Sequence, residues 1–162
     1  MRKTLITALA LLAIAGVSAA GAAAIGAGGT NSTKQRVRIE AVGDGSAVIP
    51  AVLRPITQGR HRTDQGTLTF CCWSESSVMR AGSKLLVTNP LLTFTLADGT
   101  LKIRNRIEWV DVPGGLSVQT GTWKVVGGTQ AYAGQTGHGR VASVFSNTDG
   151  HIKLRLFGWL EG

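Results

Sequence analysis

The sequence predicts an all-β fold made of about eight short strands in a single domain. From residue 34 onward, apolar residues recur at alternate positions, which is the period of a β-strand with one buried face. The runs are short and are separated by Gly, Asn-Pro or Asp-Gly, which favour turns. The chain has 162 residues, with 22 glycines but only 4 prolines, and this length suits one domain.

The first 33 residues are expected to lie outside the folded domain. Arg2 and Lys3 precede an apolar run that ends at Val17, and small residues follow, the layout of a secretory signal peptide over residues 1–20. Cleavage a few residues later and retention as a membrane anchor are the alternatives, but the apolar run is shorter than the roughly 20 residues that span a bilayer. Residues 21–33 then form a flexible Gly/Ala lead-in, and residues 34–162 form the folded domain. The protein is therefore expected to be secreted, with no membrane span after cleavage.

Each strand is predicted from its own alternation. Residues 100–110 are the clearest case, because four apolar residues and Asn105 share one face while four charged residues share the other. Pro50 interrupts an apolar run and indicates an edge or irregular strand. Asp98-Gly99 and the stretch from Asn147 to Gly150 are typical of hairpin turns. In chain order, the expected strands cover residues 36–42, 48–54, 66–73, 91–97, 100–110, 116–126, 138–145 and 151–160.

Short strands with short connections suit either a β-sandwich or a closed barrel, and periodicity leaves both open. The glycine-rich segment 123–141, which contains Gly127-Gly128-Thr129 and Gly137-His138-Gly139, resembles the corresponding segment of allene oxide cyclase-like and dirigent-like barrels. Segments 93–101 and 154–160 are similar to a hairpin and to the closing strand of their small secreted bacterial members. Gln130 stands where these families usually have glycine.

The resemblance implies an eight-stranded antiparallel barrel with a central pocket and a tendency to form homo-oligomers. It also implies chemistry guided by shape, because such barrels steer the cyclisation or coupling of reactive small molecules. Plant allene oxide cyclases also use a glutamate and an asparagine in the cavity. Glu40 is the nearest candidate for that glutamate, but alternation places it on the outer face with Arg36 and Arg38.

Asn105 is the most informative polar residue, because it lies among apolar residues on the inner face of its strand. A buried amide needs hydrogen-bond partners, and these are either the backbone and a neighbouring strand, or a ligand or water in the pocket. The pocket candidates are the residues whose side chains are expected to face the same interior: Asn105, Trp109, Phe94, Cys72, Trp123 and Phe145.

Cys71-Cys72 leaves three interpretations open. Adjacent strand residues point to opposite faces, so Cys72 would be a core residue and Cys71 an exposed thiol. The alternatives are an intermolecular disulfide through Cys71 and a strained vicinal pair that acts as a redox switch. The three histidines, His61, His138 and His151, are expected to be solvated, because their spacing does not match a metal site.

The composition bears on function mainly by exclusion. The chain has 17 Lys+Arg against 9 Asp+Glu, a formal charge of +8, but its cations lie on the outer faces of strands without interleaved aromatic residues. This favours a solvated basic face over a specific nucleic-acid site, with weak adhesion to anionic cell-surface polymers as a milder function. No nucleophile motif, paired carboxylates or cofactor motif is present. We therefore expect a non-catalytic module that binds a small apolar ligand or a cell surface, with a cyclase or dirigent-like protein and a structural oligomer as alternatives.

Overall fold

The computed structural model describes residues 34–162, so the expected signal peptide and lead-in lie outside the described residues. No helix within 34–162 is long and apolar enough to cross a membrane. The described chain forms ten strands and one short 3-10 helix, η1. The strands are β1 (Gln35–Gly43), β2 (Val48–Pro55), β3 (Asp64–Cys71), β4 (Glu75–Arg80), β5 (Ser83–Thr88), β6 (Leu91–Leu96), β7 (Gly99–Val112), β8 (Leu116–Gly128), β9 (Thr136–Ser146) and β10 (Ile152–Glu161), and η1 is Gln130–Tyr132.

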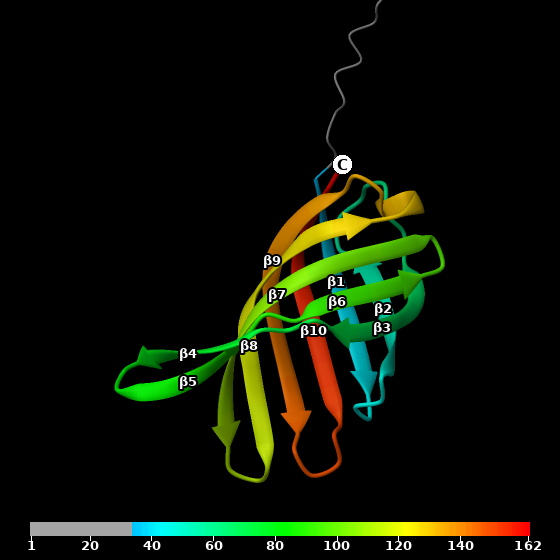
Figure 1. The fold of residues 1–162 in the computed structure, drawn as a ribbon. Coiled ribbons are helices and arrows are strands. Elements are labelled where there is room, and N and C mark those ends of the chain that lie inside the picture. The colour runs from blue at the N-terminus through cyan, green and yellow to red at the C-terminus, as the bar shows by residue number, and fades with distance from the viewer. Residues whose placement is uncertain (1–33) are drawn as a thin grey trace, which may run out of the picture. The chain divides into compact units, whose positions relative to one another are not determined.

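Eight of the strands form a closed antiparallel barrel (Figure 1). Around the barrel the order is β7-β6-β3-β2-β1-β10-β9-β8, and the pairing of β8 with β7 closes it. These eight strands overlap the eight expected from the sequence, so the all-β prediction is confirmed. Of the two architectures that periodicity left open, the structure is the closed barrel and not the sandwich. Pro50 lies in β2 one residue beyond the last β1–β2 pair, Ala41 with Ala51, so its missing N–H costs that ladder no hydrogen bond. The expectation of an edge strand there is wrong.

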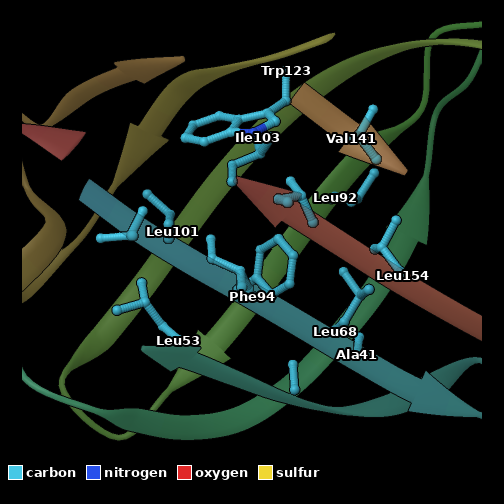
Figure 2. Packing of buried hydrophobic residues seen from close by; sticks show 14 of the residues in the cluster. Ala41, Leu53, Leu68, Leu92, Phe94, Leu101, Ile103, Trp123, Val141 and Leu154 are labelled. Carbon is cyan, nitrogen blue, oxygen red and sulfur yellow. The ribbon is translucent and has the colours of Figure 1, made fainter. Parts of the chain in front are cut away.

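Alternate side chains fill the middle of the barrel. Most inward positions of the eight barrel strands are apolar and almost fully buried, and side chains from β1, β3, β6, β7 and β10 point into one interior (Figure 2). Outward positions carry the expected cations, such as Lys102, Arg106 and Lys153. Glu40 is also on this outer side, 2.9 Å from the guanidinium of Arg155, as the alternation predicts.

Strands β4 and β5 form a hairpin, here called the arm, which projects from the side of the barrel (Figure 1). Only three residue pairs, from Leu86–Trp109 to Thr88–Ile107, join β5 to β7. Ala81 and Gly82 at the tip both have positive φ, 47° and 80°, as a two-residue hairpin turn requires. The sequence prediction missed the arm because most of β4 is exposed on both faces, so no apolar alternation marks it.

Two glycines make room for Trp123 inside the barrel. Gly139 of β9 pairs with Gly158 of β10, and a Cβ at either position would overlap backbone of the opposite strand and the indole of Trp123. The indole N–H of Trp123 donates to the carbonyl oxygens of Arg140 and Phe157, each at 3.1 Å. The absence of side chains at these two glycines therefore makes the space that this aromatic side chain occupies.

Gln130, in the glycine-rich segment, has an unusual backbone conformation. Gln130 adopts φ 52°, the left-handed conformation that glycine adopts without steric cost. Residue 130 therefore has a backbone conformation typical of glycine, although its side chain is that of glutamine.

One barrel end, which carries the β2–β3 loop, the β6–β7 turn and η1, is capped by a buried polar network. Asp64 accepts hydrogen bonds from the backbone N–H groups of Ala97 and Asp98, at 2.9 and 3.1 Å, and from the hydroxyl of Tyr132 at 2.8 Å. The ring of His61 stacks on Tyr132, with the centroids 5.2 Å apart. The expectation of a solvated His61 is wrong, since only 8% of it is exposed, whereas His138 and His151 are exposed.

The burial of His61 makes the stability of the barrel depend on pH. Burial lowers the pKa of His61, against a hydrogen bond with Gln135 that raises it. Because protonation then favours the unfolded chain, the stability due to His61 is present above the unfolded pKa of about 6.5 and is lost as the pH falls below it. In the wild type, we expect the urea concentration at the unfolding midpoint to be lower at about pH 5.5 than at about pH 7.5. The variant His61→Phe should lose this dependence, and an equal fall in both proteins would contradict the assignment.

Candidate functional site

A cavity of about 440 Å³ lies at the other barrel end, between the barrel and the base of the arm. Gly45, Ser46 and Ala47 of the β1–β2 loop form part of its wall. The barrel contributes side chains from six of its strands, β2, β3, β7, β8, β9 and β10, and the arm with its flanking links contributes most of the rest of the wall. The main apolar side chains are Ile49, Phe70, Ile107, Phe145 and Ile152 from the barrel and Trp73, Leu86 and Pro90 from the arm region.

Trp109 connects the two parts of the wall. Its indole N–H donates to the hydroxyl of Thr88 in β5 at 2.8 Å, which ties the arm to the barrel. Its ring meets Phe145 edge-on, with centroids 6.3 Å apart and an interplanar angle of 70°, an arrangement that aromatic pairs favour. These contacts hold Trp109 and Phe145 in place, and we call these two residues the aromatic corner of the cavity.

The inner side of the cavity is polar at one point. Gln119 of β8 lines the cavity with 3% of its surface exposed, between Trp109 of β7 and Ser143 of β9 in the strand register. Among residues 34–162, Gln119 Nε2 and Ser143 Oγ have no hydrogen-bond partner, and neither do the amide nitrogen and oxygen of the Asn105 side chain. We call these three residues the inner polar set.

The chemical capacity of the cavity follows from its wall. Glu75 of β4 is the one ionisable side chain that lines it within the described chain. Gln119 offers an amide N–H donor, and the rest of the wall is predominantly apolar. In the described part of the sequence, no three His, Cys, Asp or Glu side chains come together as a metal-binding group. The arrangement suits the burial of a small apolar molecule whose acceptor group reaches Gln119.

The predicted pocket residues separate into three groups. Trp109 and Phe145 line the cavity. Asn105, Phe94 and Trp123 face the barrel interior and are buried, but they lie in the packed region outside the cavity wall. Cys72 is exposed rather than a core residue, because β3 ends at Cys71 and the backbone of Cys72 is left-handed, with φ 53°.

Gln119 and Ser143 were not singled out from the sequence, although a signal for Gln119 was present. It has the same parity along β8 as Trp123, so it faces inward whenever Trp123 does. Its position beside Trp109 is set by the pairing register of β7 and β8.

Comparison of the chain with protein-family models, with curated protein sequences and with solved structures yields no match.

Proposed function

We propose that the protein binds, without transforming it, a small and mainly apolar molecule that carries a hydrogen-bond acceptor. The observation that carries the proposal is the Nε2 group of Gln119, which is buried at the cavity wall and has no hydrogen-bond partner in the described chain. Leaving such a donor unpaired costs about 1–3 kcal/mol, so a ligand oxygen or a water is needed there. An acceptor on the ligand would recover this energy.

The size and lining of the cavity support the same ligand class. A volume of about 440 Å³ falls in the range of about 300–1,000 Å³ that is typical of small-molecule sites. The aromatic corner of Trp109 and Phe145 supplies flat apolar surface, and Gln119 supplies one directional contact. The binding energy would therefore come mainly from apolar burial, and the selectivity from the amide.

Binding is favoured over catalysis by the distribution of ionisable groups. General acid–base chemistry needs a titratable group within hydrogen-bond reach of the reacting atom, and Glu75 is the single such group on the described wall. The resemblance to allene oxide cyclase-like barrels supports a role for the cavity. A cyclase remains the alternative, and analysis of the ligand after incubation with the protein distinguishes catalysis from binding. The signal-peptide layout of residues 1–20 supports action outside the cell.

The proposal is tested with the fluorescent naphthyl ketone Prodan and with dimethylaminonaphthalene, which lacks the ketone. We expect both to bind, and Prodan to bind more tightly because its carbonyl oxygen accepts from Gln119. The variant Gln119→Leu should lose about 5- to 30-fold of the Prodan affinity and little of the affinity for dimethylaminonaphthalene. Titrations followed by emission give both dissociation constants.

The matched control is Gln65→Leu, the same substitution at an exposed position of β3, which should change neither constant. If Gln119→Leu left the preference for the ketone intact, or if neither probe saturated the wild-type protein, the proposed function would be wrong. Recovery of Prodan unchanged after long incubation is expected for a binding protein.

A further inference from the structure

The two adjacent cysteines lie where β3 ends and the chain turns toward the arm. Both are exposed free thiols in the described structure. In a continuing strand their side chains would point to opposite faces. The left-handed backbone of Cys72, with φ 53°, breaks this alternation, and L-residues other than glycine adopt that conformation rarely.

The turn is held in this conformation by a side chain of β7, which is separated from β3 by β6 in the sheet. One guanidinium nitrogen of Arg104 in β7 donates to the carbonyl oxygen of Cys72 at 2.8 Å and to that of Asn89 at 3.1 Å. The N–H of Asn89 in turn donates to the carbonyl oxygen of Ser74 at 3.0 Å. Such fixation is what a strained backbone needs in order to persist, and strained residues of this kind cluster at functional sites.

The two thiols also influence each other's ionisation. A side-chain hydrogen bond with Cys72 raises the pKa of Cys71, while the nearby charges of Arg104 and Lys102 act in the opposite direction. Because the thiolate is the attacking species, the reactivity of the pair should increase as the pH rises above neutral.

We infer that Cys71 and Cys72 form a reversible thiol–disulfide exchange site, with a low-molecular-weight disulfide as the oxidant. One cysteine thiolate attacks the external disulfide, forms a mixed disulfide and releases one small thiol. The neighbouring thiolate then attacks the protein sulfur of that mixed disulfide, forms the Cys71–Cys72 bond and releases the second small thiol. Two protein thiols are oxidised and the two sulfurs of the external disulfide are reduced, so electrons and protons balance.

Adjacency makes this bond easy to reverse. The peptide between the two residues is trans, so their Cα atoms are about 3.8 Å apart. Ordinary disulfides join Cα atoms about 4.4–6.8 Å apart, and deviations store strain that makes the bond more reducible. A mild dithiol reductant should therefore reopen the ring.

Exchange at this site would be transmitted to the cavity wall. Phe70 precedes the pair, Trp73 follows it, and both line the cavity. Trp73 is 60% exposed, so ring closure can change its position without disturbing the packed interior. This link to ligand binding rests on the proposed function, whereas the exchange chemistry does not.

The test uses the purified, reduced protein with an excess of hydroxyethyl disulfide at about pH 8. Intact mass and non-reducing electrophoresis should show a monomer that has lost two hydrogen atoms and regains them with dithiothreitol. Cys72→Ser and Cys71→Ser should each stop at one stable mixed disulfide, because the resolving thiol is missing. Disulfide-linked dimers, or wild-type chains that keep two adducts, would overturn the inference.

Tryptophan fluorescence emission tests, separately from the exchange reaction, whether ring closure changes the cavity wall at Trp73. Oxidation should shift the emission of the wild type and of the matched control Trp159→Phe, but not that of Trp73→Phe. A completed ring with no shift would contradict the effect on the wall. If the reduced protein closes the ring but does not bind Prodan, the proposed function fails while the exchange site stands.

Discussion

Replacing Gly139 by alanine is expected to destabilise the barrel by about 3 kcal/mol or more. The new methyl group would overlap the carbonyl oxygen of Phe157 on the paired strand and the indole nitrogen of Trp123. Neither is the movable end of a flexible side chain, so β9 and β10 would have to separate or Trp123 would have to leave its position. The free energy of unfolding, measured by guanidinium denaturation with circular dichroism, gives the loss directly.

The matched control is Gly127→Ala in β8. A Cβ at Gly127 would meet no atom within 4 Å among the described residues, so this variant should keep the wild-type stability or gain up to about 1 kcal/mol. Equal effects of the two substitutions would show that Gly139 does not act by making room for Trp123.

Replacing Asp64 by asparagine is expected to cost about 2–3 kcal/mol. The two carboxylate oxygens accept from two backbone N–H groups, one on Ala97 and one on Asp98. An asparagine has one oxygen, so whichever way the amide is turned, one backbone N–H faces an NH₂ group. The urea midpoint of Asp64→Asn should therefore fall well below that of the wild type.

Tyr132→Phe is the comparison for this effect. It removes the hydroxyl that donates to Asp64 at 2.8 Å but leaves both backbone donors paired, so it should cost about 1 kcal/mol. If Tyr132→Phe lowered the free energy of unfolding more than Asp64→Asn does, the tyrosine hydroxyl and not the carboxylate would be the main stabilising group of this network.

The eight barrel strands could be predicted because each has one face in the core and one in water. In β7, Leu101, Ile103 and Ile107 are buried while Lys102 and Arg106 are exposed, and the period of two records this contrast. The arm has no such contrast, since Met79 is 69% exposed and the polar residues of β4 resemble a loop. A sequence pattern detects a strand only when packing divides its two faces.

The remaining errors arose where backbone conformation or a distant contact decides exposure. Cys72 continues the alternation of β3, yet its left-handed φ turns it out of the core. His61 lies in a polar loop and is buried by Tyr132, which follows it by 71 positions in the sequence. Neither fact is contained in local periodicity.

The candidate site was predictable in part for the same reasons. Trp109 and Phe145 were expected to face the interior, and they line the cavity. The place where the packed interior gives way to a cavity depends on how all inward side chains fill the barrel together, and on the arm that the sequence did not reveal. The pairing of Gln119 with Trp109 comes from the register of two strands, which alternation within either strand cannot supply.

The most direct test of the central claim is the NMR signal of the Gln119 side-chain amide in nitrogen-labelled protein, assigned by its loss in Gln119→Leu. On titration with Prodan, this signal is predicted to shift strongly and to saturate together with the fluorescence change, because the probe carbonyl accepts from Nε2. The amide signal of Gln65 on the outer face should stay in place. Saturable Prodan binding that leaves the Gln119 signal unmoved would contradict the account.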